Sequence, residues 1–150
     1  LTDARDLGLL GDHIARLRAS WPEPGDDPLG EALVHGDLHR HNAIATPDGP
    51  VLADLELAGV GSASADLVPH VVAVRRYAAD PDVLEAFLRG YGRALPAWPG
   101  FEVLVEAYEM WATAWAVANR GGSDELAAEA TVRLDHWRPG RDSARPWSLR

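Results

Sequence analysis

Apolar side chains recur at helical spacing over much of the chain. In residues 7–21 they fall three or four positions apart, as on one face of a helix, at Leu7, Leu10, Ile14, Leu17 and Trp21. Comparable runs predict helices over residues 82–95, 101–119 and 123–137, and a Ser-Asp-Glu sequence opens the last of them with a capping signal. Most of the molecule is therefore expected to be helical.

The middle of the chain follows another pattern. Two short apolar runs, residues 43–45 and 51–53, flank a Thr-Pro-Asp-Gly-Pro turn, which predicts a β-hairpin. The glycine-rich residues 59–62 predict a loop, and a helix from Ser64 or Asp66 to about residue 79 is expected after it. The fold class predicted by these patterns is α+β, mainly α, with one small hairpin.

Composition narrows the class of protein. The chain has 150 residues, of which 47% are hydrophobic and 25% charged, which suits one soluble domain or one lobe of a larger one. A formal net charge of -9 argues against nucleic acid and anionic membranes as partners. The absence of cysteine excludes disulfides, a thiolate nucleophile and Cys-ligated zinc. Glutamates interrupt the most apolar run and no signal segment is evident, so we expect a cytoplasmic protein.

Polar residues gather at the two ends of the predicted hairpin. Asp37 and Asn42 precede its first strand, and Asp54 follows its second. A tight hairpin brings its ends together, so these three side chains are expected to converge. Carboxylate and amide oxygens are ligands that Mg²⁺ prefers, and phosphoryl transfer uses one Asp toward the acceptor hydroxyl and an Asn and a second Asp toward the metal.

These motifs resemble those of a known family. The segment His-Gly-Asp-Leu-His-Arg-His-Asn at residues 35–42 resembles the catalytic loop of the aminoglycoside phosphotransferase (APH) family, and Ala-Asp-Leu-Glu at residues 53–56 resembles its metal motif. Residues 64–67 are similar to a segment of that family whose Asp braces the loop. The resemblance covers about residues 7–137. It implies a protein-kinase-like C-terminal lobe that uses Mg²⁺ and ATP or GTP to phosphorylate a hydroxyl of a small molecule.

The resemblance also implies roles for single residues. Asp37 corresponds to the catalytic base, Asn42 and Asp54 correspond to the metal ligands, and Glu56 is a weaker candidate for a second metal. The residues implied to support the loop or to contact phosphate are His35, His39 and Asp66.

The predicted helix over residues 101–119 carries two further features. Three acidic residues share one of its faces, which is either a solvated surface or an acidic wall for a cationic substrate: Glu102, Glu106 and Glu109. An aromatic stripe at helical spacing is predicted to lie in the core: Tyr108, Trp111 and Trp115.

The family pattern includes a part that this sequence does not show. Such kinases have an N-terminal lobe with a glycine-rich loop and a strand lysine, whereas all 14 basic residues here are arginine. We therefore expect the chain to lack the N-lobe, to be inactive without it, and to self-associate through the apolar surface left exposed. Its predicted organisation is a helix with a lead-in loop (1–33), a catalytic core (34–67), a helical substrate-side subdomain (68–138) and a loose tail (139–150).

Two other functions are compatible with parts of the sequence. A kinase-like lobe can bind a small molecule without catalysing a reaction on it. The Gly-Asp-Leu-His sequence at residues 36–39 also resembles a metal-binding segment of calcineurin-type phosphoesterases, although none of the later histidines stands in a two-metal setting. The intact set of base and metal ligands favours the phosphotransferase.

Overall fold

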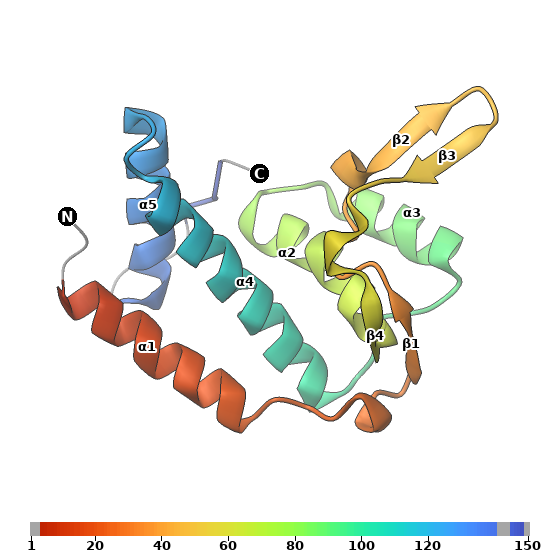
Figure 1. Cartoon of the computed structure of the whole chain (residues 1–150), viewed down its shortest axis with the longest axis horizontal. Coiled ribbons are helices and arrows are strands. Elements are labelled where there is room, and N and C mark those ends of the chain that lie inside the picture. Colours follow the sequence, from red (N-terminus) through yellow and green to blue (C-terminus); the bar gives the residue numbers. More distant parts are fainter. Residues whose placement is uncertain (1–3, 141–144, 149–150) are drawn as a thin grey trace.

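The computed structural model describes residues 4–140 and 145–148, and most of them are helical. The predicted helices are confirmed, with small shifts at their ends (Figure 1). The third predicted helix ends before residue 95, because Gly92 adopts a left-handed φ of 76° that closes its last turn. The helices are α1 (Ala4–Ala19), α2 (Val68–Arg76), α3 (Pro81–Tyr91), α4 (Pro99–Asn119) and α5 (Asp124–Trp137).

Helix α4 organises the hydrophobic core. Towards its N-terminal half it packs against α2, where Leu67, Val72 and Val105 are almost fully buried. Further along, Met110 joins a second cluster formed with α1 and α5. Figure 1 shows α4 running through the centre of the molecule between α2 on one side and α1 and α5 on the other. This long helix therefore connects both clusters into one unit.

Helix α1 buries a narrower face than the sequence predicts. Leu10 and Leu17 pack against α4 and α5, whereas Leu7 is 57% exposed, and Trp21, which lies beyond the end of α1 at Ala19, is 55% exposed. The reason is geometric, because positions seven apart lie on nearly the same line along a helix and suffice for one contact with a crossing neighbour. The outer apolar residues of α1 then remain in solvent.

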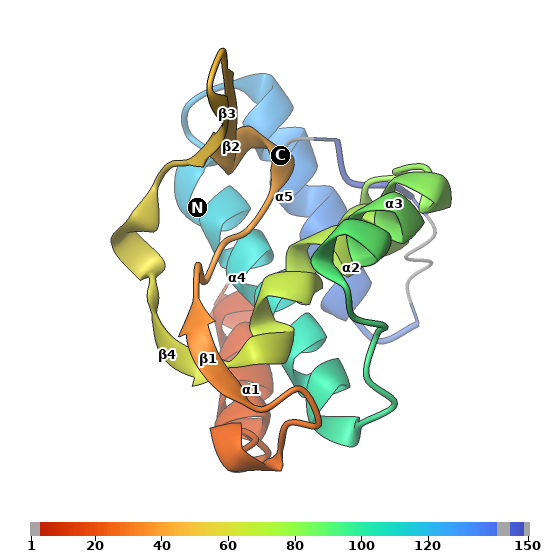
Figure 2. The ribbon, with the colours of Figure 1, turned by 90° about the vertical axis from the view of Figure 1, so that its right-hand side faces the viewer.

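The predicted hairpin is confirmed as strands β2 (Ala43–Thr46) and β3 (Gly49–Leu52), which pair antiparallel. The expectation of a loop at residues 59–62 is wrong. This segment is strand β4 (Gly59–Ser62), which pairs antiparallel with β1 (Glu31–Val34). Figure 2 shows the hairpin projecting from the body and the β1–β4 pair on one flank. Glycine-rich residues become a strand here because a distant segment supplies the backbone hydrogen bonds.

The prediction of a loose tail is wrong for residues 145–148. The Trp147 side chain is 3% exposed, and its backbone N–H donates to the Arg76 carbonyl oxygen at 2.6 Å. Ser148 donates from its backbone N–H and its hydroxyl to the Glu129 carboxylate on α5. This part of the tail therefore packs against α2 and α5. Residues 141–144 and 149–150, which belong to the same predicted tail, lie outside the described residues.

Candidate active site

The segment that contains Asp37 is held in place by a buried carboxylate. The backbone N–H of His35 donates to both oxygens of Asp66 at 3.0 Å, and the N–H of Gly36 donates to one of them at 3.0 Å. Asp66 is 7% exposed and lies in the short 3₁₀ helix η4 (Ala63–Leu67) that leads into α2. A buried carboxylate that accepts several backbone hydrogen bonds fixes the loop it binds. Asp66 therefore ties the start of the Asp37 loop to the helical body.

His35 connects the Asp37 loop to the strand end beside Asp54. Its ring Nε2 lies 2.9 Å from the Ala53 carbonyl oxygen, and its Nδ1 accepts the backbone N–H of Asp37 at 3.4 Å. A carbonyl oxygen can only accept, so Nε2 carries the proton and Nδ1 is the acceptor, which agrees with the second contact. The buried imidazole thus links the backbone of Asp37 to the residue that precedes Asp54.

Gly36 allows this loop to approach the segment after Asp54 closely. Its φ is 83°, and a Cβ placed on it would lie 2.5 Å from the Leu57 carbonyl oxygen. Only glycine combines that backbone angle with so close a contact. The backbone just before Asp37 therefore packs directly against the backbone that follows Asp54.

The carboxylate of Asp37 has two neighbours of different kinds. Tyr108, on α4, donates its hydroxyl to Oδ1 at 3.0 Å, and His39 Nε2 lies 3.5 Å from Oδ2. Burial, together with the negative charge of Asp37, raises the pKa of Tyr108 well above its usual range, so the phenol stays protonated. Oδ1 is thus occupied by a fixed donor, and Oδ2 faces the histidine.

Asn42 is joined to the residue before Asp54 at the open end of the hairpin. The Asn42 side-chain NH₂ donates to the backbone carbonyl oxygen of Asp37 at 3.0 Å, and the backbone carbonyl oxygen of Asn42 accepts the N–H of Ala53 at 2.9 Å. Asp54 follows directly, exposed and in a left-handed conformation with φ 62°. Glu56 is also exposed, in the next turn of 3₁₀ helix, η3 (Leu55–Leu57).

The side-chain oxygens of Asn42 and Asp54 suit a magnesium ion that takes its remaining ligands from water and phosphate. They are too few for a metal whose ligands all come from the protein. With its NH₂ group engaged, Asn42 keeps its side-chain oxygen for another partner, and the Asp54 carboxylate reaches solvent. Within residues 4–140 and 145–148, no group of three or more His, Cys, Asp or Glu side chains is placed to hold a metal ion. Magnesium suits such a sparse donor set because it keeps several waters and takes other ligands from phosphate.

A cavity of about 560 Å³ opens beside Asp37. Residues of the Asp37 loop, of α2 and α3, and of α4 line it, including His39, Phe87 and Tyr108. Trp111 and Trp115, which the sequence analysis assigns to the core, also line this cavity and are 50% and 43% exposed. The aromatic stripe on α4 therefore forms a wall of the cavity.

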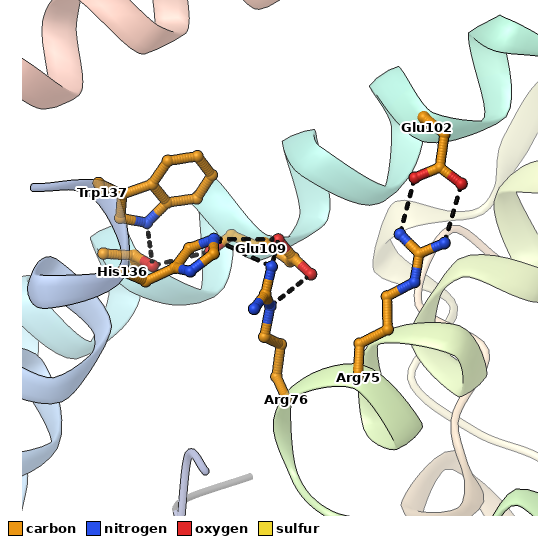
Figure 3. A network of polar contacts seen from close by, with 7 residues as sticks. Arg75, Arg76, Glu102, Glu109, His136 and Trp137 are labelled. Carbon is orange, nitrogen blue, oxygen red and sulfur yellow. Dashed lines mark hydrogen bonds and ion pairs between the residues drawn. The ribbon is translucent and has the colours of Figure 1, made fainter. Parts of the chain in front are cut away.

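The acidic face of α4 lies elsewhere. Glu102, Glu106 and Glu109 line a second hollow that shares no lining residue with the cavity at Asp37. Arg75 pairs with both oxygens of Glu102, and Arg76 pairs with those of the buried Glu109, at 2.7–3.0 Å (Figure 3). The structure therefore does not support an acidic substrate wall, because two of the three carboxylates pair with arginines of α2 and all three line a hollow separate from the cavity at Asp37.

Tyr108 is the site residue that the sequence analysis missed. It is 71 residues from Asp37, and its spacing with Trp111 is that of an ordinary core stripe. Local patterns carry no signal for a contact between a loop and a helix so far apart in the chain. A polar hydroxyl within an apolar stripe is the one feature that marks it, because a buried Tyr hydroxyl usually has a partner.

Comparison with known proteins identifies the family of the chain. A family model described as the phosphotransferase enzyme family (APH) matches residues 2–104, which include the Asp37 loop, the hairpin and Asp54. Searches of curated proteins and of solved structures found no match. Because the match covers more than half of the 150 residues, the chain belongs to the phosphotransferase enzyme family.

Proposed function

We propose that this chain is the kinase-like C-terminal lobe of an enzyme that transfers phosphate from ATP or GTP to a hydroxyl of a small molecule. The observation that carries the proposal is the Asp37 carboxylate, which lies at a ligand-sized cavity with one oxygen fixed by Tyr108. A positioned carboxylate beside a cavity is what a hydroxyl acceptor requires of its general base.

The two oxygens of Asp37 support different tasks. Oδ1 accepts the Tyr108 hydroxyl, so the acceptor hydroxyl would approach Oδ2 and release its proton there as its oxygen attacks the phosphate. His39, 3.5 Å from Oδ2, lies where it can contact the transferred phosphate or the base. His35 and Asp66 act through the backbone by holding the loop.

Asn42 and Asp54 are the residues proposed to hold Mg²⁺, with Glu56 as a further carboxylate for a second ion. Bound magnesium would neutralise charge on the nucleotide phosphates. Asn42 also orients the loop through the Asp37 carbonyl, so it would couple the position of the base to that of the metal.

An exposed apolar surface surrounds the hairpin and the β1–β4 pair. Its side chains are between 49% and 79% exposed, and they are Leu33, Ile44, Val51, Leu52, Leu55, Leu57 and Val60. An apolar surface of this kind marks an interaction site. We propose that an N-terminal lobe covers it and closes the nucleotide site, that the chain is nearly inert without that lobe, and that isolated copies associate through the same surface.

No helix among the described residues is long and apolar enough to cross a membrane. The net charge of -9 disfavours nucleic acid as a partner and is in keeping with the small-molecule substrate proposed here.

The decisive experiment measures phosphate transfer from radiolabelled ATP by the complete enzyme and by its Asp37→Asn variant. Transfer should be lost while binding of Mg-ATP, measured by calorimetry, is retained. Asp48→Asn at the exposed turn of the hairpin is the matched control and should remain fully active. Retained transfer in Asp37→Asn would exclude Asp37 as the base, and transfer lost equally in both variants would show that the effect is not specific. If the isolated 150 residues bind Mg-ATP tightly in an Asp54-dependent way, the need for a second lobe is wrong.

A further inference from the structure

We infer that the acceptor is a neutral, largely apolar compound carrying a hydroxyl, held by stacking on Trp111 and Trp115, and not a polycation. This inference rests on the proposed function in one respect only, namely that the cavity beside Asp37 receives the acceptor. It names the chemical class of that acceptor from the side chains that line the cavity.

The walls of the cavity are chiefly aromatic and aliphatic. Trp111 and Trp115, one helical turn apart on α4, present half-exposed indole rings to it. Phe87 of α3, which also lines the cavity, stacks on the His70 ring of α2, with ring centroids 3.6 Å apart. Exposed indole rings at a cavity provide flat apolar surfaces against which a ring system can stack. A volume of about 560 Å³ lies within the range of sites that enclose a small organic molecule.

The charges at the cavity do not suit a polycation. Among the residues that the structure describes, the charged ones lining it are two carboxylates, Asp37 and Asp80, and two guanidinium groups, Arg40 and Arg133. Asp80 caps α3 by accepting the backbone N–H of Asp82 at 3.0 Å, and Asp37 is assigned to the acceptor hydroxyl. A ligand with several ammonium groups needs several carboxylates, and the exposed guanidinium of Arg40 would repel it, whereas that of Arg133 is paired with Glu129.

The acidic residues that could have served a polycation are engaged on another part of the molecule. Glu102 and Glu109 pair with Arg75 and Arg76 in the second hollow. The buried carboxylate of Glu129 pairs with Arg133 at 2.7 Å and also accepts from Ser148. The acidic net charge of the chain is thus not concentrated where the acceptor would bind.

Equilibrium dialysis of the 150-residue chain against two radiolabelled probes tests the inference. Estradiol serves as a neutral polycyclic alcohol, and kanamycin serves as a polycationic polyol. We expect estradiol to bind and kanamycin to show no binding at the same concentration. Trp111→Ala and Trp115→Ala should each weaken estradiol binding by about tenfold, as loss of a stacking surface predicts. Trp21→Ala removes an indole that is 55% exposed and outside the cavity, so it should bind estradiol normally.

A second substitution keeps the test valid if a tryptophan variant does not fold. Val83 lines the cavity at the start of α3 and is 58% exposed, so Val83→Glu adds a carboxylate to the wall without disturbing the core. It should weaken estradiol binding by about tenfold, whereas Val83→Leu should not. Absence of estradiol binding, tighter binding of kanamycin, or estradiol binding unchanged in every folded cavity variant would overturn the inference.

The readout is binding alone, so it separates this inference from the proposed function. If estradiol binds as expected but the complete enzyme transfers phosphate without Asp37, only the proposed function fails. If transfer depends on Asp37 but the cavity takes kanamycin instead of estradiol, only the acceptor class is wrong.

Discussion

The Tyr108 hydroxyl donates to Oδ1 of Asp37 at 3.0 Å, joining the central helix α4 to a loop that lies 71 residues earlier in the chain. The contact determines which oxygen of the carboxylate is left for a substrate. It also links the proposed base to the helix that carries the aromatic wall of the cavity, because Trp111 lies one turn beyond Tyr108 on α4, with its ring 5.6 Å from that of Tyr108.

Tyr108→Phe should lower the turnover of the complete enzyme by about tenfold or more. A hydrogen bond to a charged group contributes about 1.5–3 kcal/mol, and without it the Asp37 carboxylate can rotate away from the acceptor. KM for ATP should stay the same, because Tyr108 acts as a positioning residue on the acceptor side. Steady-state kinetics separates the two effects. Tyr91→Phe is the control, since its hydroxyl contacts the Ala63 carbonyl outside the cavity. Equal kcat in Tyr108→Phe and the parent enzyme would contradict the role.

Asp66→Ala should destabilise the fold by about 3 kcal/mol or more. It leaves the backbone N–H groups of His35 and Gly36 without their acceptor in a buried position, and each such loss costs about 1–3 kcal/mol. Urea denaturation measures the change. Asp12→Ala, at an exposed position of α1, should be nearly neutral. If the two variants are equally stable, Asp66 does not hold the loop.

At position 54, the residue that best suits the backbone conformation is not the residue that the proposed metal site needs. Its left-handed φ of 62° costs a non-glycine residue about 1 kcal/mol, a cost that Asp bears better than Ala and that glycine avoids. Asp54→Gly should therefore be at least as stable as the parent, and Asp54→Ala should be less stable by about 1 kcal/mol. Both should lose Mg-ATP binding in the complete enzyme. Thermal unfolding and calorimetry report the two properties, and full Mg-ATP affinity in Asp54→Gly would remove Asp54 from the metal site.

Stability should fall in acid partly through Glu109. Burial acts to raise the pKa of this carboxyl, but hydrogen bonds from His136 and Arg76 outweigh it and hold the pKa below its ordinary value of 4.5. A carboxyl with a lowered folded-state pKa stabilises the protein above its unfolded-state pKa, and this contribution is lost as the pH falls through the folded-state pKa. The free energy of unfolding should thus decline as the pH drops below 4.5.

Glu109→Gln isolates that contribution. The variant should be less stable near neutral pH, and its free energy of unfolding should depend less on pH in the acid range. Some dependence should persist, because the pKa of Glu129 is also lowered: hydrogen bonds from Ser148 and Arg133 outweigh burial there. Urea titrations at a series of acid pH values measure both curves. An unchanged slope in Glu109→Gln would show that Glu109 is not coupled to unfolding.

Trp147→Ala should cost about 3–5 kcal/mol, the range for truncating a buried Trp or Phe. Its ring is buried, the Arg133 guanidinium lies 4.9 Å from the ring centroid, and Tyr77 packs against its edge. Calorimetric melting should show a large fall in Tm. The matched control is Trp21→Ala, which removes an exposed indole and should change Tm little. Similar Tm values for the two variants would mean that residues 145–148 do not stabilise the body.

Short-range sequence patterns predicted most elements and the order of the site residues. The hairpin followed from its turn residues, the helices from their periodicity, and the convergence of Asn42 with the residues beside Asp54 from the connection of adjacent strands. Each of these depends on residues close together in the chain, where spacing alone constrains geometry.

Only the tertiary structure decided the rest. The β1–β4 pairing, the docking of Trp147 on α2 and the Tyr108–Asp37 contact each join distant segments. The surroundings of each face of α4 were also decided by the tertiary structure. Helical periodicity shows which residues share a face, but it does not show which neighbouring element that face contacts. In the packed structure, Glu102 and Glu109 pair with arginines of α2, and the aromatic stripe lines a cavity. The rotation of a helix against its neighbours is set by the whole core, which no local pattern encodes.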